Sequence, residues 1–378
     1  MTRHYVVYGV GGVGKTTVSA ALAVALAKSG LKTLVVTTDP ARRLADALGI
    51  ESSPDIAPVG FCPGLDCYMP ESRQTPRTVA SELLVGHPTI AAGLVDNPVF
   101  ELLCSGLAGV HELALLASIG PRAAAYDAVV VDTAPSRHAL ELVALPGRIS
   151  RLLDSRALRW LGRIAERGPR RTVAQRVLDW GQDKLVARFE KALGEGAVSD
   201  TLAVLNAVMT IRPRLAETIR LAGELLTGPA TEHIVVLAPR HGAAHEARFF
   251  ETSLTAIAKP PSAWIVNRAL DVVPEWAIEL ARTPDLEADL ADAAGLVMSE
   301  SRLAMEAARD TVEAVLSVAP RARVHRIPGI EGASPTEVVM GVANHLGPVL
   351  LTSRPLRSER LEHVDIGRKA AAPREVQA

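Results

Sequence analysis

The sequence predicts an α/β fold in which a doubly wound, mostly parallel sheet carries an inserted α-helical subdomain. Short runs rich in valine, isoleucine and leucine are typical of strands that are buried on both faces. Helical patterns lie between most of these runs, and this alternation favours a parallel sheet with helices on both sides. The predicted strands are HYVVYG at 4–9, KTLVVTT at 32–38, DCYM at 66–69, YDAVVVD at 126–132, EHIVVLA at 232–238, SAWIVNR at 262–268 and ARVHRI at 322–327.

Two stretches interrupt the alternation and predict the helical subdomain. Residues 71–120 are expected to be helical with breaks at three prolines, and residues 147–228 form a longer helical block. Its apolar side chains either pack into the core of the subdomain or line a groove for a client helix. We expect residues 1–352 to form one domain and residues 353–378 to form a mostly disordered tail. The prolines are Pro76, Pro88 and Pro98, and the apolar pattern includes Leu152, Leu153, Leu158, Trp160, Leu161 and Ile164.

Composition narrows the class of protein. Hydrophobic residues make up 48% and charged residues 22%, which is typical of a globular protein. The net charge of −1 favours neither nucleic acid nor an anionic membrane as a partner, so any membrane contact is expected to be indirect. The first residues run directly into a predicted strand, which leaves no room for a secretory signal. Three cysteines, Cys62, Cys67 and Cys104, are too few for a disulfide framework and fit a cytoplasmic location.

The first strand leads into GVGGVGKTT, which matches the phosphate-binding pattern G-x-x-x-x-G-K-[ST]. Glycines allow close approach of the backbone, so that N–H groups point at phosphate oxygens, and the following helix N-terminus adds positive charge. Lys15 is expected to reach the β- and γ-phosphates, and the Thr16 hydroxyl is expected to bind Mg²⁺. The loop therefore refines the predicted fold to that of a P-loop NTPase. The predicted cofactor-binding residues here are Gly9, Gly11, Gly12, Val13, Gly14, Lys15, Thr16 and Thr17.

Two aspartates follow predicted strands. Asp132 ends the strand YDAVVVD, beside the phosphate loop, where a carboxylate that organises Mg²⁺ is required. Thr133, Ala134 and Pro135 then form a turn able to sense the γ-phosphate. Asp39 follows the second strand and is a candidate to orient or deprotonate the attacking water. Taken alone, Asp39 before Pro40 is more readily interpreted as a helix N-cap.

Three segments together are similar to one known family. GVGGVGKTT, TDPARRLADALG and VVVDTAPSRHALELVALP resemble the phosphate loop, switch I and switch II of the ArsA/Get family of ATPases. GLAGVHEL resembles a helix start of that family, with Ala108 in place of a proline. WIVNR resembles its late strand, which ends in an adenine-reading asparagine, and HRIPGIEG resembles the loop on the adenine side. The order of these segments, over 1–146 and 230–335, is much more specific than a single phosphate loop.

The resemblance implies a role for each matching position. Lys15 and Thr16 would bind phosphate and Mg²⁺, Asp39 would position the hydrolytic water, and Asp132 would hold Mg²⁺ through water. Asn267 would hydrogen-bond adenine and Pro328 would lie on the adenine side, which together favour ATP. The family works as a dimer with nucleotide at the interface, and closure of the dimer is coupled to a distant helical surface. The resemblance thus implies a Mg²⁺-dependent ATPase that captures or releases a protein client or partner.

The family's deviant phosphate loop carries a signature lysine where this chain has Val10. That lysine reaches the phosphates of the partner subunit, and a cation acting in this way is worth about 10³–10⁵ in rate. Three alternatives remain open. A paralogue that bears the lysine completes the site in a heterodimer, an arginine (Arg42, Arg43 or Arg137) substitutes for it in a homodimer, or hydrolysis is slow. The sequence is most similar to a bacterial ArsA-related subgroup that lacks the signature lysine.

Two other functions are alternatives. A subunit of an arsenite or antimonite efflux pump needs converging thiolates, and the surroundings of the three cysteines do not match the family's metalloid site. A regulatory or positioning ATPase like MinD or ParA would need an amphipathic membrane helix or a basic DNA-binding surface. The sequence of the tail, residues 353–378, is only weakly amphipathic. No CxxC pair is present, so no zinc is expected. His138, and the pair His241 and His245, are interpreted as polar surface or packing rather than as metal ligands.

Overall fold

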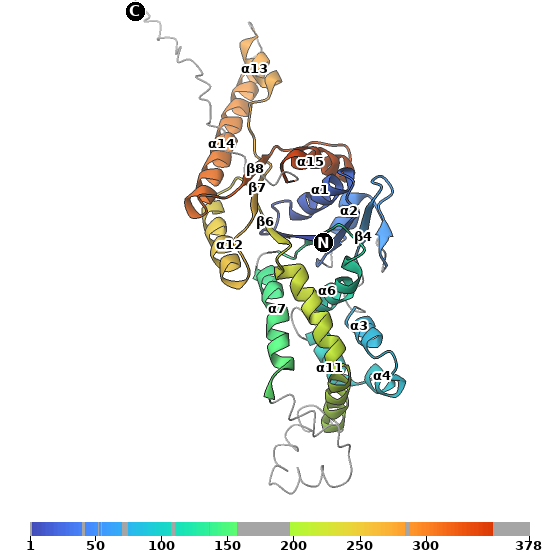
Figure 1. Cartoon of the computed structure of the whole chain (residues 1–378). Helices are drawn as coiled ribbons and strands as arrows, with labels where there is room; N and C mark the ends of the chain where they lie inside the picture. Colours follow the sequence, from blue (N-terminus) through green and yellow to red (C-terminus); the bar gives the residue numbers. More distant parts are fainter. Residues whose placement is uncertain are drawn as a thin grey trace, which may run out of the picture.

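The computed structural model has an eight-stranded sheet with helices on both faces (Figure 1). It describes residues 2–39, 42–51, 53, 55–69, 75–106, 110–135, 137–156, 197–283 and 288–350. The strands follow the order β3-β4-β2-β5-β1-β6-β7-β8, and all pairs are parallel except β3 with β4. The strands are β1 (Arg3–Tyr8), β2 (Thr33–Thr37), β3 (Ala57–Pro58), β4 (Leu65–Tyr68), β5 (Ala128–Asp132), β6 (Thr231–Leu237), β7 (Ala263–Asn267) and β8 (Val324–Ile327).

All seven predicted strands are confirmed, with ends that differ by one or two residues. Strand β3 is not among the predicted strands, because it has only two residues and lies antiparallel at the edge of the sheet. Its Pro58 is a residue that sheets accept at edges, because proline has no N–H to donate. The doubly wound α/β fold is therefore the observed one.

The side chains of the central strands alternate between two apolar cores. On β1, Tyr5 and Val7 pack with α1 (Lys15–Lys28), α2 (Arg43–Leu48) and α15 (Pro335–Leu350). Val6 and Tyr8 face the opposite core, which includes residues of α6 (Val110–Ala123), α7 (Arg137–Leu153), α11 (Ala197–Thr227), α12 (Ala243–Ile257) and α14 (Ala288–Val318). Burial on both faces explains why these strands read as continuous apolar runs.

The helical stretch before β5 consists of α3 (Thr75–Leu83), α4 (Pro88–Val95), α5 (Pro98–Gly106) and α6. Pro88 and Pro98 are the first residues of their helices and Pro76 is the second of α3, so the predicted breaks are confirmed as helix starts. Helix α11 packs against α4, α5, α6 and α7, and these helices extend away from the sheet (Figure 1).

The predicted start of the second helical block, at residue 147, is too late. Helix α7 already starts at Arg137 and runs through Pro146, which the sequence analysis had placed before the block. Of the predicted apolar pattern, Leu153 is buried and Leu152 is 61% exposed. Leu158, Trp160, Leu161 and Ile164 lie outside the described residues, as does the predicted tail 353–378. The division into one domain with an inserted subdomain stays a prediction.

The remaining helix, α13 (Glu275–Arg282), precedes α14 beyond the end of β7 (Figure 1). Among the described residues, no helix is both long and apolar enough to cross a membrane.

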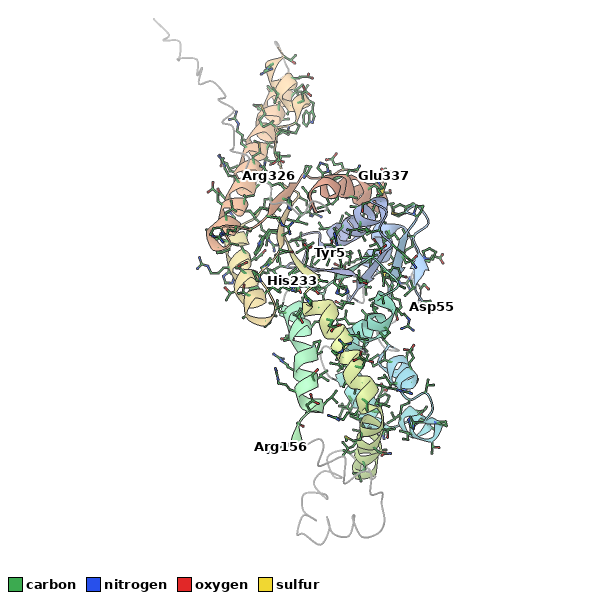
Figure 2. The ribbon with its side chains drawn as sticks, viewed as in Figure 1. Tyr5, Asp55, Arg156, His233, Arg326 and Glu337 are labelled. Atoms are coloured by element: carbon green, nitrogen blue, oxygen red, sulfur yellow. The ribbon has the colours of Figure 1, made fainter. Side chains whose placement is uncertain are left out.

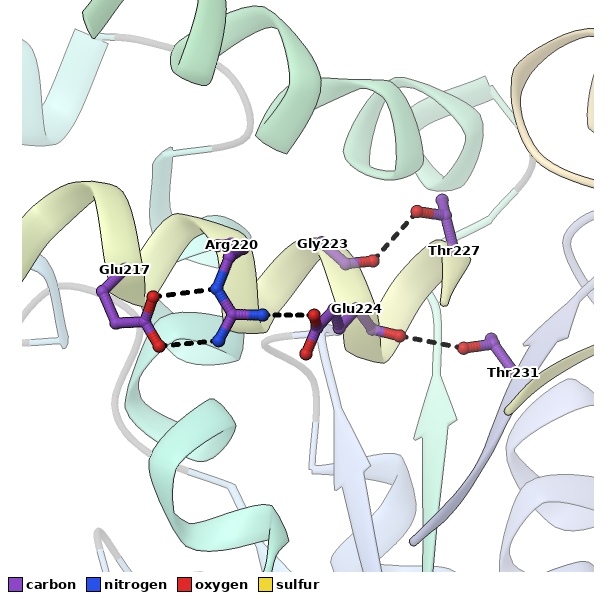
Figure 3. Close-up of polar contacts among 6 residues, drawn as sticks. All are labelled: Glu217, Arg220, Gly223, Glu224, Thr227 and Thr231. Atoms are coloured by element: carbon purple, nitrogen blue, oxygen red, sulfur yellow. Dashed lines mark hydrogen bonds and ion pairs between the residues drawn. The ribbon is translucent and has the colours of Figure 1, made fainter. Parts of the chain in front are cut away.

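The C-terminal end of α11 is joined to β6 by a threonine (Figure 3). The Thr231 hydroxyl lies 3.0 Å from the carbonyl oxygen of Glu224 and 3.2 Å from that of Leu225, so its single hydrogen is shared between two carbonyl groups of the last helical turn. On the exposed face, Arg220 lies between Glu217 and Glu224 and bonds both carboxylates. Exposed pairs of this kind contribute little to stability. The buried threonine therefore fixes the direction in which β6 enters the sheet.

A buried histidine lies next to the strand that feeds the phosphate loop. His233 on β6 (Figure 2) is 1% exposed, and its Nδ1 lies 2.9 Å from the hydroxyl of Tyr8. Its Nε2 is buried with no hydrogen-bond partner in the described part of the chain. Burial lowers the pKa of His233 to about 4, and the positive charge of Lys259 acts in the same direction. The native state therefore holds this imidazole neutral.

We expect the free energy of unfolding to fall between pH 7 and pH 5. The unfolded state binds a proton to His233 near the ordinary pKa of 6.5, whereas the native state does so only near pH 4. The stabilising contribution is thus complete above pH 6.5 and is lost as the pH falls toward 4. The expected loss at pH 5 is about 2 kcal/mol, measured by urea unfolding. His233→Gln should remove this contribution and leave those of His4 and His325, whose pKa values burial also lowers, whereas the same change at exposed His241 should leave the dependence intact.

Candidate nucleotide-binding site

The loop between β1 and α1 spans residues 9–14, and the backbone requires glycine at three of its four glycine positions. Gly12 and Gly14 have φ angles of 82° and 87°, in the left-handed region. A Cβ atom at Gly9 would lie 2.6 Å from the carbonyl oxygen of Val236. Gly11 has open space around it. The loop therefore passes close to β6 at its start and turns sharply before the helix.

An asparagine from β7 supports the end of this loop. Asn267 is 5% exposed, and its Nδ2 donates to the carbonyl oxygen of Val13 at 2.8 Å. The same nitrogen lies 2.3 Å from where a Cβ at Gly14 would stand. The backbone N–H of Ala269 donates to the carbonyl of Ile327 at 2.8 Å, which holds Pro328 near the end of β7. Both predicted adenine-side residues thus lie at the carboxyl edge of the sheet, and adenine recognition stays a prediction.

We expect Gly14→Ala to lower the free energy of unfolding by about 2 kcal/mol or more. Alanine at a φ of 87° is strained, and its Cβ would push the Asn267 amide from Val13. Gly11→Ala is the matched control, because its Cβ would meet nothing within 4 Å. Urea unfolding of both variants without nucleotide measures the difference. Equal stability of the two variants would show that the loop relaxes around the new methyl group.

Lys15 begins α1 and is 7% exposed. Burial lowers its pKa, whereas the negative charges of Asp132 and Asp39 raise it. The N-cap of α1 is Gly14, with no capping side-chain bond, and the first turn contains no acidic residue. The first N–H groups of the helix are therefore not capped by a side chain, as an anion site requires. Thr16 and Thr17 follow on the same turn and are half-buried.

Asp132 lies at the end of β5 with no solvent exposure, and three hydroxyl groups bond its carboxylate. Thr16 Oγ1 donates to Oδ2 at 2.9 Å, Thr37 Oγ1 to Oδ2 at 3.2 Å, and Ser19 Oγ lies 3.0 Å from Oδ1. Burial raises the pKa of Asp132, while the Thr16 bond, the charge of Lys15 and the Ser19 and Thr37 bonds lower it. The fold thus brings two of the predicted metal-site residues, Thr16 and Asp132, into direct contact.

Asp39 lies beyond the end of β2, and its backbone N–H donates to Thr37 Oγ1 at 3.1 Å. Its carboxylate forms an ion pair with Arg43, with Oδ2 3.5 Å from Nη1. Helix α2 begins at Arg43 and its N-cap position is Arg42, so the interpretation of Asp39 as the helix N-cap is wrong. The structure therefore places this carboxylate at the same edge of the sheet as Lys15 and Asp132.

Val10, in the place of the signature lysine, packs against both apolar cores. Of the arginines considered as substitutes, Arg43 is the partner of Asp39 and Arg42 is exposed. The side chain of Arg137 lies outside the described residues.

Ser19 and Thr37 are site residues that the sequence analysis missed. Ser19 is one helical turn after Lys15, and Thr37 is the register partner of Asp132 across β2 and β5. The doublet of threonines at the end of β2, before Asp39, was the available signal. The sequence alone did not connect these threonines with Asp132, because that contact depends on β2 lying beside β5.

The cysteines are free and buried, and burial raises the pKa of each thiol, that of Cys67 to about 12. Cys62 and Cys67 belong to one apolar core, as small hydrophobic residues often do. The exposed His241 and His245 have no third ligand, because no group of three His, Cys, Asp or Glu suited to a metal occurs among the described residues. Trp264 is fully buried and belongs to an apolar core, and Trp160 lies outside the described residues.

A strand, a glycine-rich loop and a helix, beside a carboxylate at the end of a neighbouring parallel strand, define the class of P-loop NTPases. Within this class, residues 2–167 match the model of the family described as anion-transporting ATPases. Through this segment the chain is similar to the ArsA/Get family, as its motifs predict.

Three relatives illustrate the similarity. An uncharacterized protein of Streptomyces coelicolor is 31% identical over 248 residues, which cover 62% of this chain and 61% of that protein. The arsenical pump-driving ATPase of Acidiphilium multivorum is 30% identical over 39% of this chain and 26% of its own length. ATPase GET3C of Arabidopsis thaliana is 30% identical over 38% of this chain and 41% of its own length. The aligned part thus spans less than two thirds of each relative.

Proposed function

We propose that this chain binds and hydrolyses ATP with Mg²⁺ at the loop formed by residues 9–17. The observation that carries this proposal is the meeting of Lys15, Thr16 and Asp132 at one edge of the sheet, with Asp39 nearby. Relatives over the same segment are named ATPases, which supports the nucleotide class. Bound ATP would supply the transferable phosphoryl group, and Mg²⁺ would neutralise its charge.

The residues present suit these cofactors. Mg²⁺ prefers oxygen ligands and is usually held by one or two carboxylates together with substrate phosphates. The Thr16 hydroxyl and the Asp132 carboxylate offer such oxygens, and Asp132 is already held by Ser19 and Thr37. Lys15 and the first N–H groups of α1 would bind phosphate oxygens. Asp39 would orient the attacking water or accept its proton, and Asn267 and Pro328 would border the base.

We further propose that the ATP cycle drives capture or release of a protein client or partner by a dimer. Val10 leaves the site without its signature cation, so a lysine-bearing paralogue or an arginine of a second copy would complete it. The helices that extend from the sheet carry exposed apolar side chains that a partner could cover. These side chains are Val85, Val95, Leu102, Leu103, Leu152 and Leu202. Others in the same block, such as Leu84, Leu94 and Val204, pack into a core of their own.

Metalloid efflux gains no support from the described cysteines. A metalloid site needs thiolates, whereas burial raises the pKa of all three thiols and keeps them protonated at neutral pH. Stimulation of ATP turnover by arsenite or antimonite, lost in cysteine-to-serine variants, would overturn this interpretation. A role in positioning on membrane or DNA is likewise not favoured by any described surface.

The decisive experiment measures ATP turnover and molecular mass for the purified chain, alone and with a partner that copurifies from its native host. Turnover above that of Lys15→Ala supports hydrolysis by the chain itself. A dimer of one chain type that turns over ATP rapidly would favour the arginine alternative. Turnover that appears only with a second chain would favour the heterodimer. ATP binding without turnover in either state would reduce the protein to a nucleotide-gated binding module.

A further inference from the structure

The hydroxyl group of Thr37 contacts both segments that carry the candidate carboxylates, Asp39 and Asp132. Thr37 ends β2 and is 5% exposed. Its Oγ1 donates to Asp132 Oδ2 at 3.2 Å and accepts the backbone N–H of Asp39 at 3.1 Å. A hydroxyl has a single hydrogen, and the amide can only donate, so the direction of both bonds is fixed. The side chain of Asp132 and the start of the Asp39 segment are therefore held by one atom.

The neighbouring threonine ties the same two segments together a second time. The backbone N–H of Thr38 donates to the carbonyl oxygen of Asp132 at 2.8 Å. The Thr38 hydroxyl in turn accepts the backbone N–H of Ala134 at 3.0 Å. Thr38 itself is 6% exposed, so water does not readily compete for these bonds. The segment after β2 and the segment after β5 thus form one hydrogen-bonded unit.

We propose that Thr37 is a positioning residue that couples the metal-binding carboxylate to the hydrolytic one. This inference rests on the proposed function, because it assigns Thr37 a task within that site. Asp132 accepts a hydrogen bond from Thr16 on its Oδ2 atom, the atom that also accepts from Thr37. A change at Thr16 when Mg²⁺ and phosphate bind is therefore passed to Thr37, and from Thr37 to the backbone of Asp39.

The coupling makes the approach of Asp39 depend on an occupied metal site. Without the Thr37 hydroxyl, the Asp39 N–H loses its acceptor, and Asp132 loses one of three hydroxyl donors. Lys15, Thr16 and Ser19 still face Asp132, so phosphate binding is retained while the two segments move independently. The expected signature is a loss in turnover number rather than in affinity for ATP.

The test compares Thr37→Val with Thr37→Ser, which restores the hydroxyl. Thr33→Val is the control, because Thr33 is a buried threonine on the same strand whose hydroxyl donates to the carbonyl of Leu31 at 2.9 Å, away from the site. For Thr37→Val we expect kcat to fall about tenfold or more, with KM for ATP changed less than about twofold. The Mg²⁺ concentration for half-maximal turnover should rise. Thr37→Ser and Thr33→Val should behave as the wild type does.

A second measurement needs no ATP turnover. Hydrogen exchange of the Asp39 amide should accelerate in Thr37→Val and stay slow in Thr37→Ser and Thr33→Val, all without nucleotide. Unchanged exchange in Thr37→Val, or equal kinetic losses in Thr37→Val and Thr37→Ser, would overturn the proposal. If the wild type neither binds nor turns over ATP, the proposed function fails, and the exchange result alone then shows whether Thr37 holds the Asp39 segment.

Discussion

Replacement of Lys15 by alanine is expected to abolish ATP-dependent stabilisation and turnover while leaving the nucleotide-free protein folded. A lysine that binds phosphate oxygens makes charge-assisted hydrogen bonds worth about 1.5–3 kcal/mol each. Two such bonds correspond to a loss of affinity of at least about 100-fold. Lys15 starts α1 at the end of the glycine loop and is almost completely buried, so no other described lysine replaces it there.

The pKa of Lys15 indicates in which direction Lys15→Ala changes the stability of the nucleotide-free protein. Burial lowers that pKa despite the nearby negative charges of Asp132 and Asp39, so the fold disfavours the ammonium relative to water. Removing the ammonium therefore removes an unfavourable interaction, and the melting temperature without nucleotide should be unchanged or higher. Such a cost in the free protein is common for groups that are placed for function rather than stability.

Thermal unfolding with and without Mg²⁺–ATP measures both expectations. At a concentration of about 100 times Kd, ATP stabilises the wild type by about 2.7 kcal/mol, and this shift should nearly vanish in Lys15→Ala. Lys28→Ala is the matched control, because Lys28 is exposed at the opposite end of the same helix. Equal ATP turnover in the wild type and in Lys15→Ala would refute hydrolysis by this chain.

The parts of the fold that were predictable are those encoded locally. The phosphate loop is defined by spacing within nine residues, and the buried strands by runs of apolar residues. Both depend on neighbours in the sequence, so one chain was enough to find them. Helix α7 was misjudged at Pro146, because proline is a helix breaker in a sequence pattern but is accommodated here within a long packed helix.

The hydrogen-bond network of the site depended on contacts between distant segments. Thr37 and Asp132 are 95 residues apart, and only the strand order places β2 beside β5. Asn267 is a second residue whose contact depends on the topology. The resemblance to the ArsA/Get family implies an adenine contact for this residue, and its amide nitrogen is bonded to the Val13 carbonyl of the phosphate loop. A residue type and its place at a strand end indicated the site, whereas the partner of each atom required the topology.

Replacement of Asp39 by asparagine is expected to separate ATP binding from ATP hydrolysis. The carboxylate is 16% exposed, close enough to Lys15 to raise the pKa of that lysine, and paired with Arg43 at 3.5 Å. An amide of the same shape keeps the backbone N–H bond to Thr37 but cannot accept a proton from water. General-base catalysis contributes about 10²–10⁴ in rate, so kcat should fall by at least about 100-fold. ATP-dependent stabilisation should persist.

Two controls separate the chemistry of Asp39 from its ion pair. Asp46→Asn makes the same change at an exposed position on α2 and should leave turnover unchanged. Arg43→Gln breaks the pair but keeps the carboxylate, so it should preserve most of the turnover if Asp39 acts on water. A loss in Arg43→Gln as large as that in Asp39→Asn would instead assign the effect to the arginine, which is a candidate for the cation absent at Val10. Full turnover in Asp39→Asn would remove this carboxylate from the reaction.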